Sequence, residues 1–205
     1  MAILPIYNCF HPILRKKTDR VENFDGKLKI LLDNMFKSMY YSEGVGLAAN
    51  QVGVLNSIVI IHPNSGDNSK KQYKPLAMIN PLIEAFSDDN STFQEGCLSI
   101  PKFFEDVVRP KFIQVKYTDV NMKEISLETD EILSRIIQHE VDHLNGILFI
   151  DRLSILKKTL AKSKLKRIQR GDVDADYSMV QPDGKLFVPD NHKRGAGNSR
   201  LQNEK

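Results

Sequence analysis

The segment from about Asp130 to Asn145 constrains the fold more than any other part of the chain. Its spacing of four, three and four residues places four side chains on one face of a helix: Ile132, Ile136, His139 and His143. Gly146 follows in the position where helices commonly end. The pattern predicts a helix that carries two histidines beside an apolar wall.

Other segments predict the elements around this helix. Apolar residues at helical spacing predict a second helix over Gly26–Tyr41, and a basic helix is expected over about Ser154–Gln169. Short β-forming runs separated by prolines favour antiparallel strands near 57–62, 77–79, 82–85, 107–108, 112–117 and 124–128, the last two paired across a turn. We therefore expect an α+β fold, with antiparallel β-sheets packed around the central helix and a further helix near the C-terminus.

Composition indicates an ordinary soluble protein of one domain. The chain has 205 residues, of which 41% are apolar and 27% charged. No apolar stretch approaches the roughly 18–20 residues that span a bilayer, and the N-terminus lacks the features of a secretory signal. Its two cysteines, Cys9 and Cys97, do not form a disulfide framework. We expect a cytoplasmic monomer that binds neither DNA nor membranes.

Positive charge is concentrated near the C-terminus. Residues 152–170 carry a charge of +8 with no acidic residue, and since the whole chain is +3, the rest carries −5. A basic helix over 154–170 is most simply a solvated surface element, packed by Leu153, Leu156, Leu160, Leu165 and Ile168. The same charge would also attract a polyanion.

Two segments lack any regular pattern. Residues 64–74 are polar and expected to form a mobile loop, and residues 172–205 are rich in Asp, Asn, Gly, Lys and Pro. We expect residues 1–171 to form the catalytic domain, including the basic helix, and residues 172–205 to form a polar, partly ordered tail.

The sequence His139-Glu140-Val141-Asp142-His143 carries the clearest chemical signal. Two histidines four apart on a helix can share one metal ion, and the glutamate beside the first can reach a water on that metal without being a ligand. Because short motifs of this kind also arise by chance in polar helices, the pattern alone leaves both interpretations open.

A third ligand and a substrate-binding segment have to come from elsewhere. Cys97, after Gly96 and before Pro101, is a candidate ligand, although a lone cysteine is more often a core residue. The run from Gly44 to Gln51 has two glycines and an amide that can donate a hydrogen bond, but it is equally consistent with a simple turn into a strand.

Together, three segments resemble peptide deformylases of the bacterial type. They read GVGLAANQ at 44–51, EGCLS at 95–99 and QHEVDHLNG at 138–146. Their order and separations are similar to those of the family, and the resemblance extends from about Pro5 to Leu153. It implies a hydrolase that removes the N-formyl group from the formyl-methionine of newly synthesised polypeptides, by attack of a metal-bound water.

The resemblance also implies a role for individual residues. Cys97, His139 and His143 would hold the metal, which in the family is usually Fe²⁺ and is replaced by Ni²⁺ or Zn²⁺. Glu140 would act as the proton carrier, and the Gln51 side chain with the Leu98 N–H would bind the oxyanion.

The same resemblance assigns the substrate contacts. Gly46 would align the peptide by β-type hydrogen bonds, and Val45, Ile132 and Ile136 would form the methionine pocket. Family members approach the ribosome through a C-terminal extension, so the basic helix is a candidate for ribosome contact.

This chain departs from the common pattern at a few positions. Asn50 stands where many members have proline, which we expect to change only the stiffness of the loop. Phe104 stands where arginine or tyrosine is frequent, near the substrate entrance, which leaves the peptide preference open. Arg109 and Asp142 match positions that the family keeps polar. We expect them to pair and to orient the metal-binding helix, although a surface ion pair is also consistent with the sequence.

Two other functions remain as alternatives. A zinc endopeptidase uses the same two-histidine helix, but its third ligand is usually His or Glu rather than a thiolate. A structural metal site or an inactive binding module is the non-enzymatic alternative, but structural sites are closed by four protein ligands and only three candidates are found here.

Overall fold

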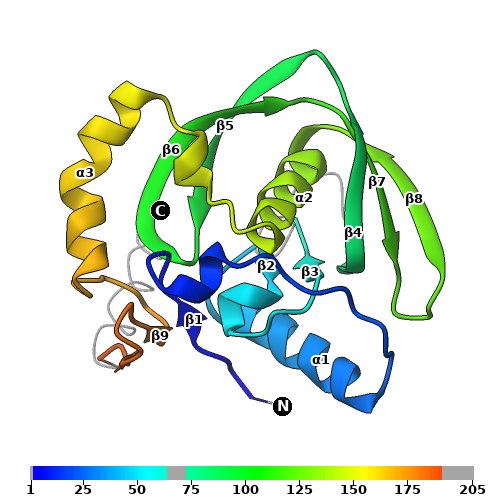
Figure 1. Ribbon diagram of the computed structural model, residues 1–205, viewed down its shortest axis with the longest axis horizontal. Helices are drawn as coiled ribbons and strands as arrows, with labels where there is room; N and C mark the ends of the chain where they lie inside the picture. Colours follow the sequence, from blue (N-terminus) through cyan, green and yellow to red (C-terminus); the bar gives the residue numbers. More distant parts are fainter. Residues whose placement is uncertain (1, 64–72, 191–205) are drawn as a thin grey trace, which may run out of the picture.

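The computed structural model describes residues 2–63 and 73–190 (Figure 1). The helices are α1 (Gly26–Tyr41), α2 (Glu131–Leu144) and α3 (Ile155–Gln169), with 3₁₀ turns at Pro12–Arg15, Ala49–Val52 and Phe149–Arg152. The strands are β1 (Ile6–Tyr7), β2 (Gly46–Ala48), β3 (Ile58–Ile61), β4 (Leu76–Phe86), β5 (Asn90–Cys97), β6 (Ile100–Pro110), β7 (Ile113–Thr118), β8 (Glu124–Thr129), β9 (Met179–Val180) and β10 (Leu186–Phe187).

Helix α2 lies at the centre of the molecule, with strands on both sides of it in Figure 1. Every residue from 133 to 144 is buried, which confirms the predicted central helix. Its apolar side chains pack against β3, β4 and β7 in one cluster that includes Leu133, Ile137 and Val141. A helix in this position can carry polar side chains only if partners surround them.

A five-stranded antiparallel sheet, in the order β2-β3-β4-β7-β8, covers one side of α2. The predicted pairing of the last two strands is confirmed, because Ile113–Thr118 pairs with Glu124–Thr129 throughout. The strands expected at 77–79 and 82–85 are instead one strand, β4. Pro81 is tolerated inside it because the register shifts between Ile79 and Leu82, where the ladder is already interrupted.

Strands β5 and β6 form a long hairpin on the other side of α2 (Figure 1). Only residues 107–108 of this hairpin were expected from the sequence. Strand β5 is mostly polar, and its residues from Asn90 to Gln94 are exposed or half-buried, so the apolar alternation that marks a strand is absent. The hairpin ends beside α2 and brings Cys97 to the histidines.

A third sheet joins the two ends of the chain, in the order β1-β9-β10. Strand β1 pairs with β9 in parallel, an exception to the antiparallel rule expected for the fold. These strands are only two residues long and gave no pattern in the sequence. Part of the predicted tail is therefore structured, whereas residues 191–205 and most of the expected 64–74 loop (64–72) lie outside the described residues.

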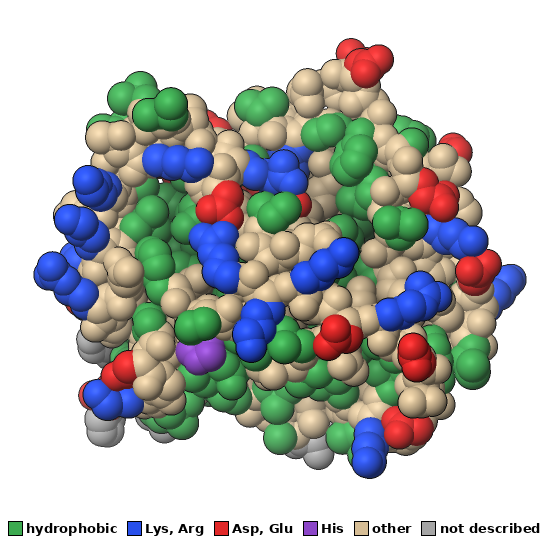
Figure 2. Space-filling model, viewed as in Figure 1, with side chains coloured by type: hydrophobic (Ala, Val, Ile, Leu, Met, Phe, Trp, Pro, Cys, Tyr) green, Lys and Arg blue, Asp and Glu red, His purple; other side chains and the backbone are tan. Residues whose placement is uncertain are grey.

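Helix α3 packs against the molecule through a narrow face. Ala161 and Ile168 are buried, together with Leu153 just before the helix, and Leu165 packs beside them. The expectation that Leu156 and Leu160 also pack is wrong, since these side chains are 69% and 74% exposed. Figure 2 shows Lys and Arg side chains along the left edge of the molecule, over α3.

No helix in the described part of the chain is long and apolar enough to cross a membrane.

Candidate active site

Cys97, His139 and His143 come together as predicted. Their potential ligand atoms all lie within 4.8 Å of one another, and the Cys97 Sγ lies 3.2 Å from the His143 Nε2. The two histidines project from successive turns of α2, with ring centroids 5.1 Å apart, and Cys97 comes from the end of β5. One thiolate and two imidazoles form a donor set suited to a divalent transition metal, with room for a fourth ligand.

The two imidazoles differ in protonation. Burial by itself lowers the pKa of His139, but hydrogen bonds with Cys97 and Glu95 outweigh it and raise the pKa to about 10. Burial and the charge of His139 lower the pKa of His143 well below its usual range. Both imidazoles must be unprotonated to bind a metal, so an ion held here would displace the proton of His139.

A buried carboxylate, Glu95, fixes the orientation of His139. Its Oε2 accepts from the His139 Nδ1 at 2.9 Å, which leaves Nε2 as the nitrogen available to a metal. The Arg109 guanidinium donates two hydrogen bonds of 2.7 and 2.9 Å to the same carboxylate, and Arg135 donates a third of 2.9 Å. Burial would raise the pKa of Glu95, but its bonds to His139 and Arg109 hold it well below its usual range.

The predicted pairing of Arg109 with Asp142 is confirmed. Arg109 donates from Nη1 to Asp142, which also accepts from Arg152. The alternative prediction of a surface ion pair is wrong, because both residues are buried: Arg109 is 2% and Asp142 is 7% exposed. The sequence did not identify Glu95 as the residue that links this pair to a histidine, although Glu95 stands in the EGCLS motif.

Glu140 lies beside Gly46 at the pocket. A Cβ on Gly46 would lie 2.5 Å from the Glu140 Oε1, so only glycine allows the strand to run this close. The Oε2 of Glu140 is buried without a hydrogen-bond partner among the described residues, and burial raises the pKa of this carboxyl to about 7. Such a carboxylate is able to take a proton from a water near neutral pH.

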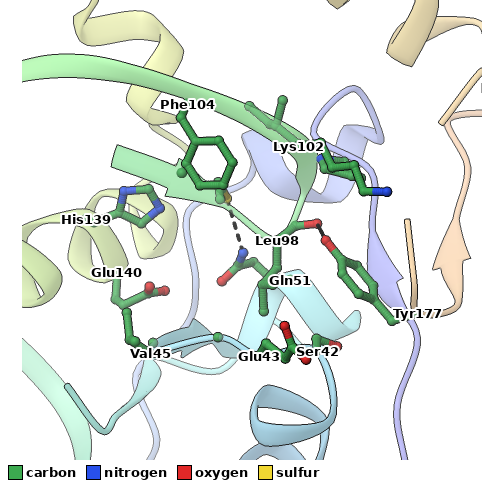
Figure 3. Close-up of a pocket in the computed structure, with 16 residues that line it drawn as sticks. Ser42, Glu43, Val45, Gln51, Leu98, Lys102, Phe104, His139, Glu140 and Tyr177 are labelled. Atoms are coloured by element: carbon green, nitrogen blue, oxygen red, sulfur yellow. Dashed lines mark hydrogen bonds between the residues drawn. The ribbon is translucent and has the colours of Figure 1, made fainter. Parts of the chain in front are cut away.

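The Gln51 amide is held in one orientation. Its Oε1 accepts from the Ala48 N–H at 2.9 Å, which turns Nε2 toward the Ser99 hydroxyl at 3.2 Å and the Cys97 Sγ at 3.5 Å (Figure 3). Asn50, expected to affect only loop stiffness, is fully buried and donates to the His143 carbonyl. The segment therefore contacts α2 directly.

A cavity of about 360 Å³ opens in front of these groups (Figure 3). The predicted residues that line it include Val45, Gly46, Gln51, Cys97, Leu98, His139 and Glu140. Ile136 is buried next to Gly46 and Ile132 is 38% exposed, and neither belongs to the lining. Phe104 lines the cavity and packs over Gly96.

Two further lining residues, Lys102 and Tyr177, carry no recognisable signal in the sequence. Tyr177 lies in the predicted tail, and its hydroxyl donates to the Leu98 carbonyl at 2.7 Å. Lys102 forms ion pairs with Asp174 and Asp176 of the same tail. Neither contact follows a local spacing, so pattern analysis could not find them.

Known proteins resemble this chain over most of its length. A family model described as polypeptide deformylase matches residues 3–159. The peptide deformylase of Salinibacter ruber is 40% identical over 189 residues, covering 88% of this chain and 96% of its own, and that of Brachyspira hyodysenteriae is 42% identical over 161 residues, covering 78% and 86%.

Solved structures show the same fold. A plant peptide deformylase superposes with a TM-score of 0.78 at 34% identity, covering 84% of this chain and 92% of its own. The enzyme from Ehrlichia chaffeensis in complex with actinonin gives a TM-score of 0.75 at 37% identity, covering 83% and 99%. With a model match over most of its length and relatives at about 40% identity, the chain belongs to the polypeptide deformylase family.

Proposed function

We propose that Cys97, His139 and His143 hold one divalent metal ion, with Fe²⁺ as the native metal and Ni²⁺ or Zn²⁺ as replacements. The observation that carries the proposal is the convergence of these three donors beside an unpartnered Glu140 carboxylate oxygen. A metal bound there would polarise the formyl carbonyl and lower the pKa of a water.

The surrounding residues would carry the proton transfer and stabilise the negative charge of the reaction. Glu140 takes the proton of the attacking water and delivers it to the amine nitrogen as the bond to the formyl carbon breaks. The Gln51 amide, fixed by Ala48, and the Leu98 N–H stabilise the negative charge on the formyl oxygen. The products are formate and a free N-terminal methionine.

The edge of the sheet supplies a place for the peptide. Within residues 2–63 and 73–190, strand β2 pairs with β3 alone, so its other edge can pair with an extended substrate. Gly46 lies on this strand next to Glu140, and Val45 precedes it at the cavity. We propose that Val45 and Ile136 contact the methionine side chain. The contact of the exposed Ile132 with the methionine side chain stays a prediction.

The alternative functions are less well supported. A thiolate ligand does not suit a zinc endopeptidase, and a closed structural site would need a fourth protein donor, which the described residues do not bring to this group. A carboxylate that can act as a base, beside three potential metal ligands and an open cavity, favours hydrolysis instead.

Formate release from a formyl-Met-Ala-Ser peptide by anaerobically purified protein tests the proposal. We expect turnover of the formylated peptide and no cut at internal peptide bonds. An acetyl-Met-Ala-Ser peptide is the matched control, because its extra methyl group tests the small space at the carbonyl carbon. Internal cleavage would support the endopeptidase, and an inert metal-loaded protein would support a structural site.

We also propose that α3 contacts the ribosome. Its exposed Ile155, Leu156 and Leu160 lie beside a basic surface that would be attracted to ribosomal RNA. The Lys162→Glu/Lys166→Glu variant should co-sediment less with ribosomes at low salt, whereas Lys27→Glu/Lys29→Glu on α1 should behave as wild type. Equal binding by both variants contradicts the proposal. A cytoplasmic location and a monomeric state stay predictions.

A further inference from the structure

The turn between β5 and β6 carries the backbone of the proposed oxyanion contact. Cys97 at the end of β5 pairs with Ile100 at the start of β6, so Leu98 and Ser99 are the two residues of the turn. Peptide groups are planar, so a residue has only two soft backbone torsions. The Leu98 N–H and carbonyl lie in adjacent peptide planes joined by these two torsions, and because strand pairing holds both ends of the turn, fixing the carbonyl also limits the direction of the N–H.

This turn is held from outside by the β1-β9-β10 sheet. Tyr177 donates its hydroxyl to the Leu98 carbonyl at 2.7 Å (Figure 3), and Cys9 donates its N–H to the Ser99 carbonyl at 2.9 Å. The segments that carry them are paired, since β1 and β9 lie side by side. Both carbonyls of the turn are thus bonded to one small unit built from the two ends of the chain.

Neighbouring groups help to hold the hydrogen bond from Tyr177 to Leu98 in place. Burial raises the pKa of the Tyr177 hydroxyl, which keeps it protonated and able to donate. Three residues earlier, Asp174 pairs with Lys102 of β6 at 3.0 Å, and Asp176 lies 3.8 Å from the same ammonium group. The segment is therefore attached to the cavity wall at the turn and at the start of β6.

This segment lies beyond residues 3–159, which match the family model. We propose that Tyr177 is a positioning residue for catalysis: its hydroxyl holds the Leu98–Ser99 turn so that the Leu98 N–H faces the formyl oxygen. The inference rests on the proposed function, and it makes the C-terminal segment part of the working active site.

Replacing Tyr177 by phenylalanine tests the inference in the full-length, metal-loaded protein. Loss of one net hydrogen bond should lower kcat for formyl-Met-Ala-Ser by about 3- to 10-fold and leave KM within about two-fold. Tyr117→Phe is the matched control, because it removes a hydroxyl from a buried tyrosine of β7 in the core cluster on the other side of α2. It should leave kcat unchanged.

An amide signal gives a second readout that does not depend on turnover. In zinc-loaded protein labelled with ¹⁵N-leucine, the Leu98 resonance should shift in Tyr177→Phe and stay in place in Tyr117→Phe. A wild-type kcat in Tyr177→Phe, an equal loss in both variants, or a loss explained by lower metal content would overturn the inference. If wild-type protein releases no formate, the proposed function fails, and an unmoved Leu98 signal would then separately overturn the positioning of the turn.

Discussion

The carboxylate of Glu95 lies between His139 and Arg109, accepting from the histidine Nδ1 at 2.9 Å and from the guanidinium at 2.7 and 2.9 Å. The side chain of His139, a proposed metal ligand, is therefore oriented by a buried ion pair and not by packing alone. Arg135 and Asp142 extend the same network across β6 and α2.

Glu95→Gln should weaken metal binding. An amide cannot match the charge of two buried guanidinium groups, and it no longer accepts in the same way from His139, so we expect a loss of about 10- to 100-fold in metal affinity. Competition with a chelator measures it. Glu84→Gln, on the exposed part of β4, is the control, and equal affinities for the two variants would contradict this role.

The same substitution should change stability with pH. Because the pKa of Glu95 is held below its usual value, its ionised form stabilises the folded protein above about pH 4.5. That contribution is lost as pH falls from there toward the lower folded-state pKa. Urea unfolding should show the wild type more stable than Glu95→Gln by about 3 kcal/mol at pH 7, with the gap narrowing below pH 4.5. A gap that is independent of pH would argue against an ionised Glu95.

Gly46→Ala should slow catalysis. The new Cβ would lie 2.5 Å from the Glu140 Oε1 and 2.9 Å from the Ile136 Cγ2, so the carboxylate must move. A shift of about 1 Å in a reacting group can cost about 100-fold in rate, and we expect a loss of kcat between 10- and 100-fold. Gly26→Ala has no atom within 4 Å of its Cβ and should remain active. Full activity in Gly46→Ala would mean that Glu140 acts from another position.

Gln51→Leu should remove an oxyanion donor while keeping the side-chain volume. We expect kcat to fall by about 100- to 1,000-fold with an unchanged metal content. Steady-state kinetics and metal analysis of the same sample check both points, and Gln114→Leu on β7 serves as the control. If KM rose and kcat did not change, Gln51 would bind the substrate without acting in the transition state.

Peroxide should inactivate the iron form, since a thiolate ligand and Fe²⁺ are both oxidisable. Cys9 is buried, which raises its pKa and keeps it a thiol, so mass spectrometry should find oxidation at Cys97 and not at Cys9. Unchanged activity of the iron form after peroxide treatment would contradict this expectation, and the nickel form should resist better.

Local patterns predicted the elements whose signal lies within one segment. The bounds of α1 match the prediction, and α2 agrees to one residue at each end, because apolar spacing and the glycine after α2 are read directly from the sequence. The resemblance to the family supplied the three proposed ligands and the expected pairing of Arg109 with Asp142.

Contacts between distant segments could not be predicted in the same way. Strand β5 is mostly polar, so no apolar alternation marks it. The bond from Tyr177 to Leu98 joins residues 79 apart, and the pairing of β1 with β9 depends on strands of two residues each. Leu156 and Leu160 follow a helical spacing but stay exposed, because spacing defines a face without showing what covers it.

Comparing Glu140→Gln with the wild type tests whether Glu140 carries the proton of the reaction, with formate release and bound metal measured on the same anaerobic samples. We expect one metal ion per chain in both proteins and turnover of formyl-Met-Ala-Ser in the wild type alone, because Glu140 carries the proton and is not a ligand. Wild-type turnover in Glu140→Gln would contradict that role, and loss of metal from the variant would mean that Glu140 helps to hold the ion.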